Sequence, residues 1–464
     1  MQQIPWSMQQ IKQCEKETGQ AMLSDEHTLV FYAQDFGKLT QSIPAAACIP
    51  PSTEKIQAIL AYASQHKLPV TIRGNGLSQG GQSLSVNGLT LHLEQLNAVL
   101  DKESDAIWVE ANTSWAQLLD VSLKSAQIPY VLPYNCHLSI GGVLSVGGVG
   151  ASSFKWGSVT AHVKALEVVL AHGEKQIVDS RSPLFHACLS GQGQFAVMTK
   201  ACVRLRSCQN KVRTFFLVYA DKEQWLNDLI ELKNKADYIE AFCSPSVQGA
   251  KLVFDKRVPF AQWLFAIHAS VEYDNNPPEF TALSKNLRPW KLLHKQDESI
   301  HSYLHRHDSR FEAMKITGQW DLLHPWYECF VPSNLLANSL DEVLAELPLH
   351  YATVLQIVPI ASQQQTGFLM LPKTKDIFAL MILNPGVNPA LLASCLQAMN
   401  ALDARFLKLG GKRYLSGYLG RDLPKSYWEN HFGVLYEEWR NCKKEFDSNQ
   451  VFTSLLHSIE SDSL

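Results

Sequence analysis

The stretch "VTIRGNGLSQGGQS", residues 70–83, runs from a short apolar segment straight into a glycine-rich loop. Glycines in this position usually let the backbone come close to phosphate, because they carry no Cβ atom. The segment "GNGLSQ" begins like the dinucleotide-binding fingerprint, but its sixth position is Gln79 and turn-forming residues follow it. That fingerprint requires a helix to start inside the motif. Taken alone, this motif is therefore compatible with a plain surface turn as well as with a cofactor-binding loop.

The segments around this loop alternate between helical and strand patterns. Residues 52–67 carry apolar side chains at helical spacing, with Ser52 at the N-cap position. Within the first 210 residues, strand-like segments are expected at 69–72, 89–93, 106–111 and 194–205, and a capped amphipathic helix at 113–127. Apolar residues at every second position, with a turn at 172–173, predict a hairpin at 164–178. Because this alternation lacks regular βαβ spacing, the region is expected to be α+β rather than doubly wound.

Length and charge limit the class of protein. A chain of 464 residues is expected to form two domains. Lys plus Arg number 41 against 44 Asp plus Glu, so the net charge is -3 and nucleic acid is not an expected partner. The sequence shows no secretory signal pattern and no apolar run long enough for a membrane span. Ten cysteines are scattered without a CxxC pair, which is typical of reduced thiols in a cytoplasmic protein.

Two further glycine-rich segments follow the first. "LSIGGVLSVGGVGASSFKWG" (138–157) is too long for a turn and too apolar for a flexible linker, and "LSGQGQFAV" (189–197) leads into a strand. Small residues and backbone N–H groups are what a loop needs to lie against a pyrophosphate and a flat ring. Three such segments within one region indicate a long dinucleotide cofactor.

A histidine cluster in "HSYLHRHD" raises the question of a metal site. It contains His301, His305 and His307, without an obvious carboxylate or cysteine partner at ligand spacing. A solvated helix face is the simpler interpretation, and no metal site is expected.

The order of the three glycine-rich segments resembles the FAD domain of the vanillyl-alcohol-oxidase, or PCMH-type, superfamily. Later segments are similar to cytokinin dehydrogenase: "DYIEAF" (237–242), "QWDLLHPWYECFVP" (319–332), "GGKRYL" (410–415) and "YWENHFG" with "KKEFDSNQVF" (427–452). The resemblance covers nearly the whole chain from about Ile49.

This resemblance implies an α+β FAD-dependent oxidoreductase. Its PCMH-type FAD-binding domain, made of two α/β subdomains, would span residues 1–210, with a core at about 42–207. A substrate domain with an antiparallel sheet and flanking helices would span 211–420, and residues 421–464 would return to the FAD domain.

The resemblance also implies which residues contact FAD. Ser78 and Gln82 would hydrogen-bond cofactor oxygens, and the glycines would offer backbone amides to the pyrophosphate. The implied contacts are Ile72, Gly74, Asn75, Gly76, Leu77, Ser78, Gln82, Ser139, Gly142, Ser145, Val149, Val197 and Tyr414. The structural alternatives are a core aromatic for Tyr414 and a helix or turn hydroxyl for Ser145.

The sequence departs from the family where FAD is attached. The family's first loop is G-x-G-H-S and its histidine carries the flavin covalently, whereas this chain has Leu77 there. Leucine offers no nucleophile, so non-covalent FAD is expected. Cys136 is the alternative attachment point, although a buried thiol explains it equally simply. The family's tail glutamine that contacts FAD corresponds here to Leu456.

The sequence also departs from the family at the positions that are expected to contact the substrate. The family has an aspartate five residues before the position of Ser139, where this chain has Tyr134. A phenol with an ordinary pKa of about 10 is a poor base at neutral pH. Glu240 retains the family's glutamate, and Glu328 replaces a neutral residue. Tyr134 (if its pKa is lowered), Glu240 and Glu328 are therefore the candidate catalytic proton acceptors. The family's active-site tryptophan region is not recognisable in residues 359–372.

Three hypotheses follow. The first is a cytokinin-dehydrogenase-like amine dehydrogenase of altered specificity, which would pass electrons to oxygen or a quinone. The second is an alcohol, sugar or aldonolactone oxidase on the same scaffold. The third is a flavin-binding protein without turnover.

Overall fold

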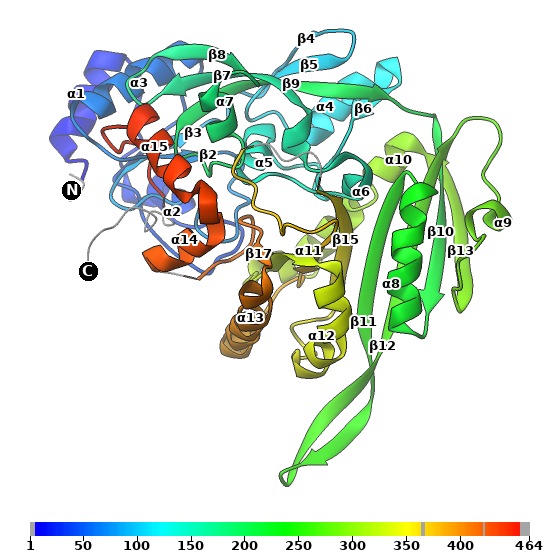
Figure 1. Cartoon of the computed structure of the whole chain (residues 1–464). Coiled ribbons are helices and arrows are strands. Elements are labelled where there is room, and N and C mark those ends of the chain that lie inside the picture. The colour runs from blue at the N-terminus through cyan, green and yellow to red at the C-terminus, as the bar shows by residue number, and fades with distance from the viewer. Residues whose placement is uncertain (1–4, 363–366, 421–422, 455–464) are drawn as a thin grey trace.

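The computed structural model describes residues 5–362, 367–420 and 423–454, and its strands form three sheets (Figure 1). Two of them belong to the N-terminal part of the chain. The smaller sheet is parallel, in the order β1 (Ala46–Cys48), β3 (Leu89–His92), β2 (Val70–Arg73). The larger is antiparallel, in the order β4 (Val99–Lys102), β5 (Ala106–Glu110), β9 (Ala196–Ser207), β7 (Val163–Leu170), β8 (Lys175–Asp179), with β6 (Gln127–Pro129) paired to β9. The helices of this region are α1 (Met8–Thr18), α2 (Glu26–Tyr32), α3 (Thr53–Gln65), α4 (Trp115–Ser122), α5 (Ile140–Val146), α6 (Ser153–Trp156) and α7 (Pro183–Cys188).

The third sheet is antiparallel and has eight strands. Their order is β13 (Lys291–Ser299), β10 (Lys211–Tyr219), β12 (Lys256–Tyr273), β11 (Tyr238–Val253), β15 (Leu355–Ala361), β16 (Asp376–Ile382), β14 (Tyr327–Pro332), β17 (Lys412–Arg413). The remaining helices are α8 (Lys222–Glu231), α9 (Phe280–Leu283), α10 (Ile300–Leu304), α11 (Asp308–Ile316), α12 (Ser333–Glu346), α13 (Leu392–Phe406), α14 (Lys425–Phe432) and α15 (Tyr436–Phe446). The long hairpin of β11 and β12 projects beyond the rest of the sheet (Figure 1). The α+β class predicted from the sequence is confirmed; the domain boundaries at 210 and 420 stay a prediction.

The eight-stranded sheet has two different faces, because side chains alternate along each strand. On β11, Ile239 and Ala241 enter an apolar core that also contains residues of α8, α12 and α13. Glu240 and Phe242 therefore point to the opposite face, where they line a cavity. The alternation thus packs apolar side chains against the helices on one face and turns Glu240 and Phe242 towards the cavity on the other.

The C-terminal segment returns to the first glycine-rich loop. The amide of Val70 donates to the carbonyl oxygen of Val451 at 2.7 Å, and the amide of Thr453 donates to Val70 at 3.0 Å. Figure 1 shows the red C-terminal helices beside the blue N-terminal region. Leu456 lies outside the described residues.

The predicted elements of the first 210 residues are confirmed with two corrections. The helix expected over 113–127 ends at Ser122 and gives way to a strand at Gln127. The second glycine-rich segment, expected as a loop, contains the short helix α5. Ile140, Val143 and Leu144 are buried on this helix, so apolar packing outweighs the poor helix propensity of its glycines.

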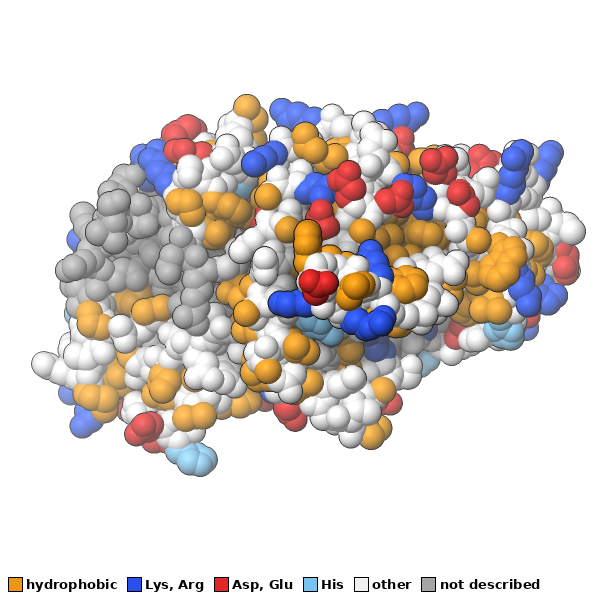
Figure 2. All heavy atoms as spheres, turned by 90° about the horizontal axis from the view of Figure 1, so that it is seen from below, with side chains coloured by type: hydrophobic (Ala, Val, Ile, Leu, Met, Phe, Trp, Pro, Cys, Tyr) orange, Lys and Arg blue, Asp and Glu red, His pale blue; other side chains and the backbone are white. Residues whose placement is uncertain are grey.

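Among the described residues, no helix combines the length and the apolar character that crossing a membrane requires. All ten cysteines are free thiols. Figure 2 shows basic and acidic side chains interspersed over the face seen from below.

Candidate active site

The three glycine-rich segments meet around one cavity, which we call the glycine-rich cavity. Its walls come from β2 and the loop after it, from α5, from the loop before β9 and from the C-terminal segment. The lining residues used below are Ile72, Gly74, Asn75, Gly76, Leu77, Ser78, Gln82, Asn112, Ser139, Gly142, Ser145, Gln192, Ala196 and Met198. Segments far apart in the chain therefore line a single cavity.

Two features of this cavity suit a dinucleotide: glycines in its wall, and polar atoms beside it that lack a hydrogen-bond partner. A Cβ atom on Gly74 would lie 2.5 Å from Ser139 Oγ, so a larger residue there would displace the Ser139 side chain. Gly76 has φ +68°, a left-handed conformation that side chains disfavour. Within the described part of the chain, Asn112 Oδ1 and both amide atoms of Gln192 are buried without a hydrogen-bond partner. Polar atoms left unpaired beside a cavity are expected to bind a polar ligand.

Asp35 fixes the first glycine-rich loop, a role that sequence reasoning missed. Its Oδ2 atom accepts hydrogen bonds from Ser78 Oγ at 2.9 Å and from the Gly81 amide at 2.8 Å. Gln82 similarly donates to the carbonyl oxygen of Leu415 at 2.9 Å. The side chains of Ser78 and Gln82 thus already shape the loop, besides facing the cavity. A single aspartate outside any motif gave no sequence signal.

The glycine-rich cavity borders a second one, which we call the aromatic cavity. Residues that line both include Leu77, Val143, Val146 and Ser416. The aromatic cavity measures about 450 Å³. Its walls carry Phe36, Tyr134, Phe216, Phe242, Tyr303, Phe311, Trp320, Trp326 and Tyr414. Such a wall suits a planar or apolar small molecule.

One row of side chains crosses the eight-stranded sheet on the cavity face. Phe242 on β11 pairs with Gln356 on β15, which pairs with Met381 on β16, which pairs with Glu328 on β14. All four line the aromatic cavity. The strand register therefore places the carboxyl group of Glu328 in the wall of the aromatic cavity, next to Met381.

Glu328 is 7% exposed, and the Ser416 hydroxyl donates a hydrogen bond to it. Burial raises the pKa of Glu328 to about 7, although Ser416 and Arg413 act in the opposite direction. A carboxyl group with this pKa exchanges a proton near neutral pH. Because Ser416 also lines the glycine-rich cavity, Glu328 stands where the two cavities meet.

Glu240 is buried but already paired. Its carboxylate accepts hydrogen bonds from Arg306 Nε at 2.8 Å and from His307 Nε2 at 2.9 Å. Burial would raise the pKa of Glu240, but the positive charge of Arg306 and the contact with His307 outweigh it and hold the pKa well below its usual range. Glu240 is therefore ionised, with both carboxylate oxygens engaged.

Tyr134 lies beside this pair, with its ring edge-on to His307 at a centroid distance of 5.0 Å. Its hydroxyl group is buried without a partner among the described residues. Burial, reinforced by Glu240, raises the pKa of Tyr134 well above its ordinary value. Tyr134 was a candidate base only if its pKa were lowered, and this condition is not met. Its phenol can instead donate a hydrogen bond.

Arg310 on α11 brings an unpaired positive charge to the aromatic cavity. Its Nη2 atom donates to the carbonyl oxygen of Leu383 at 2.5 Å, and no carboxylate of the described residues forms an ion pair with it. Burial lowers the pKa of this guanidinium. Glu298, which also lines the cavity, accepts hydrogen bonds from Gln296 and Ser302. Arg310 is therefore available to a ligand.

The other sequence-predicted contacts fall in different places. Val149 and Tyr414 line the aromatic cavity, and the Tyr414 hydroxyl accepts a hydrogen bond from the Gly148 amide at 2.9 Å. Val197 is fully buried in the core, because Ala196 and Met198 occupy the cavity side of β9. A contact from Val197 to FAD would have to come from its backbone.

The segment with His301, His305 and His307, expected from the sequence to be a solvated helix face, is only partly exposed. His301 is exposed, but His307 is largely buried against Glu240. Arg306, His307 and Arg310 were missed as cavity residues, because "HRHDSR" carries no pattern that distinguishes a buried polar segment from a surface helix.

Comparisons with known proteins identify matching family models and several relatives of this chain. A family model described as "FAD binding domain" matches residues 44–179, and one described as "Cytokinin dehydrogenase 1, FAD and cytokinin binding" matches residues 209–454. The chain is 25% identical over 446 residues to an uncharacterised oxidoreductase, ORF5 in the fasciation locus, from Rhodococcoides fascians, covering 92% of this chain and 96% of the relative. It is 26% identical over 462 residues to cytokinin dehydrogenase 9 of Oryza sativa subsp. japonica (91% and 87% covered). It is 24% identical over 480 residues to cytokinin dehydrogenase 2 of Arabidopsis thaliana (94% and 93% covered).

Proposed function

Because this chain belongs to the cytokinin dehydrogenase family of FAD-dependent oxidoreductases, we propose that it oxidises a C–N or C–O bond of a small molecule held in the aromatic cavity. FAD, when bound, supplies the acceptor for the hydride. The glycine-rich cavity would hold the cofactor through Gly74, Gly76, Ser139 and Gly142. Attachment would be non-covalent, since Leu77 lacks a nucleophile and Cys136 lines neither cavity.

The observation that carries this proposal is the position and pKa of Glu328. Oxidation of an alcohol or amine releases an O–H or N–H proton together with the hydride, and a base must accept that proton. Glu328 can do so near neutral pH, because its pKa is raised by burial to about 7. Glu240 would act differently: its ionised carboxylate would hold Arg306 and His307 at the cavity wall. Tyr134 would donate a hydrogen bond to the substrate.

The substrate would carry an anionic group. Arg310 is half-buried, and a partly desolvated guanidinium without a carboxylate partner among the described residues favours an anionic ligand. Arg310 would bind a carboxylate or phosphate by charge-assisted hydrogen bonds, while the aromatic side chains enclose the rest of the molecule.

Isoprenoid cytokinins are accordingly not the proposed substrates. Tyr134 replaces the carboxylate that the family uses for the substrate amine, and losing one charged hydrogen bond costs about 1.5–3 kcal/mol. The second candidate function, an alcohol or sugar oxidase, is favoured by the same Glu328, because an alcohol depends on a base more strongly than a neutral amine does.

An anaerobic substrate screen tests this function. The FAD-loaded protein is mixed with neutral and acidic amines, alcohols and sugar acids, and bleaching of the flavin absorbance reports reduction. Reduction by acidic members of the panel is expected. A flavin that stays oxidised with every compound would support the remaining hypothesis, a flavin-binding protein without turnover.

A further inference from the structure

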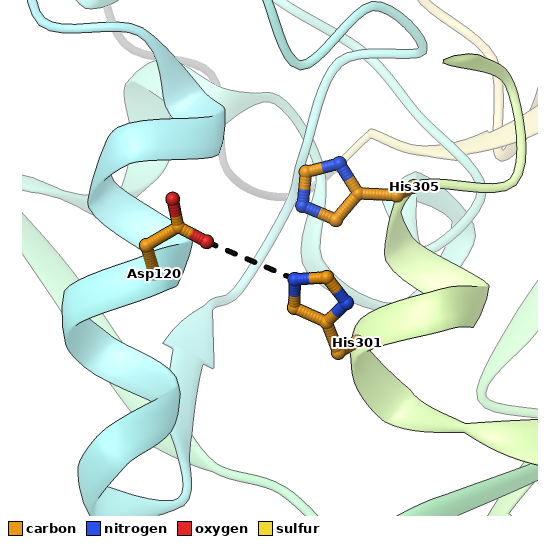
Figure 3. A group of neighbouring side chains, drawn as sticks. All are labelled: Asp120, His301 and His305. Atoms are coloured by element: carbon orange, nitrogen blue, oxygen red, sulfur yellow. Dashed lines mark ion pairs between the residues drawn. The ribbon is translucent and has the colours of Figure 1, made fainter.

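Outside the two cavities, Asp120 on α4 and His301 and His305 on α10 and at its end form a cluster, which we call the His–Asp cluster (Figure 3). We infer that it binds one divalent transition-metal ion of the Zn²⁺ type and so ties α4 to α10. The proposed oxidation does not require this site, so metal binding here can be tested independently of it.

The three side chains offer one ligand atom each, and these atoms lie within 4.8 Å of one another. His301 Nε2 is 3.7 Å from Asp120 Oδ1. Figure 3 shows ring nitrogens of both histidines and the carboxylate facing a common gap. Ligands bound to Zn²⁺ at about 2.0–2.2 Å sit closer together than this, so small rotations of the exposed Asp120 and His301 side chains close the site.

The two histidines stand one helical turn apart. The His305 amide donates to the His301 carbonyl oxygen at 3.2 Å, which places both imidazoles on the same face of the turn. Histidines at positions i and i+4 form a common metal-binding pair, and a carboxylate is a frequent third ligand. A water molecule would complete the tetrahedral coordination, as at other sites with three protein ligands.

Asp308 prepares His305 for this role. The Nδ1 atom of His305 is 2.9 Å from Asp308 Oδ2, and His137 Nε2 is 3.4 Å from Asp308 Oδ1. A carboxylate on one ring nitrogen fixes the tautomer of a metal-bound histidine and leaves the other nitrogen as the ligand. In His305 that other nitrogen, Nε2, is buried without a hydrogen-bond partner in the described part of the chain.

An ion pair alone does not explain this arrangement. Asp120 and His301 are 64% and 60% exposed, so their contact contributes little to stability. It also leaves the Nε2 atom of His305 unsatisfied, which carries a cost for a buried polar group. A metal ion satisfies all three side chains at once.

The His–Asp cluster lies between α4 and α10, so a bound ion would affect the segment that follows α10. α4 lies in the N-terminal region, whereas α10 leads directly to Arg306 and His307, which hold Glu240. A bound ion would therefore stabilise the segment that carries one wall of the aromatic cavity.

Calorimetric titration of the FAD-loaded chain with ZnCl₂, after removal of metal by EDTA, tests the inference. We expect one saturable site per chain. His301→Ala and His305→Ala should each weaken binding by at least about tenfold, and Asp308→Asn by about tenfold, as for other second-sphere carboxylates. His172→Ala is the matched control, because His172 also pairs with a carboxylate, Glu174, on an exposed turn.

A second readout uses thermal unfolding. Zn²⁺ should raise the midpoint of the wild type and of His172→Ala, but not that of the double variant His301→Ala/His305→Ala. Unchanged flavin content verifies that each variant is folded. The inference is overturned if the wild type shows no saturable site, or if both single variants bind Zn²⁺ within about twofold of the wild type.

Discussion

The Ser416 hydroxyl donates a hydrogen bond to the buried carboxyl group of Glu328, and both residues line the aromatic cavity. Ser416 comes from the chain after β17, whereas Glu328 comes from β14. The hydrogen bond lowers the pKa of Glu328, but burial raises it by more, to about 7. This balance makes the carboxyl group a proton acceptor near neutral pH.

The pH dependence of the free energy of unfolding should reveal the raised pKa of Glu328. Since the folded-state pKa of about 7 exceeds the ordinary value of 4.5, the native protein retains a proton that the unfolded chain has lost. The free energy of unfolding therefore falls as pH rises between these two values. Glu328→Gln removes the effect, so its stability relative to wild type should rise by roughly 2–3 kcal/mol from pH 5 to pH 8. Urea unfolding of the FAD-loaded proteins measures this, and a constant difference would mean that Glu328 titrates normally.

Gly76→Val should yield protein with little FAD. The valine would be strained at φ +68°, and its Cβ would lie 2.3 Å from Arg73 Nη2, so the loop that lines the glycine-rich cavity at Gly76 would have to shift. Gly318→Val is the matched control, because Gly318 has φ +73° but no atom within 4 Å of its Cβ position. The ratio of flavin to protein absorbance after purification measures occupancy. Equal occupancy in the two variants would remove this loop from the FAD site.

Acid or heat denaturation should release FAD from the wild type. Leu77 replaces the attachment histidine, and Cys136 is a buried thiol that lies 3.6 Å from the Leu304 carbonyl oxygen. Burial raises the pKa of this thiol to about 12, so it is not a thiolate at neutral pH. Flavin fluorescence that stays with the denatured chain on a gel would contradict non-covalent binding.

Arg310→Gln should raise KM for an acidic substrate by about tenfold to a hundredfold, because one charge-assisted hydrogen bond is lost. The same change should have little effect on a neutral analogue of that substrate. Arg257→Gln is the matched control, because Arg257 is exposed near the tip of the β11–β12 hairpin. Steady-state kinetics with both substrates decide the matter: equal changes for the two would exclude an anionic contact at Arg310.

Much of the fold could be predicted from local patterns. Apolar spacing identified α3, period-two alternation identified the hairpin of β7 and β8, and strand-like segments identified β2, β3, β5 and β9. The helix α5 was missed, because its glycines disfavour a helix and only tertiary packing of Ile140 and Leu144 overrides that preference. The partner strands of the eight-stranded sheet could not be predicted, since register depends on contacts between distant segments.

The candidate site was predictable where a motif existed. Gly74, Gly76 and Ser139 could be located from the glycine-rich segments. The pairing of Glu240 with Arg306 and His307 could not, because these residues lie 66 and 67 positions away along the chain. The same limitation applies to Asp120, which completes the His–Asp cluster from a different helix.

The central claim, that Glu328 accepts the substrate proton, is tested most directly by stopped-flow reduction of the flavin under anaerobic conditions across pH. With the best alcohol or sugar substrate from the screen, the wild-type rate should rise with pH and level off above about 7, where Glu328 is ionised. Ser416→Ala should shift this transition to higher pH, because it removes a hydrogen bond that lowers the pKa of Glu328. Glu328→Gln should reduce the rate by about 10² to 10⁴ and abolish the transition while FAD stays bound. A wild-type rate in Glu328→Gln at every pH would contradict the claim.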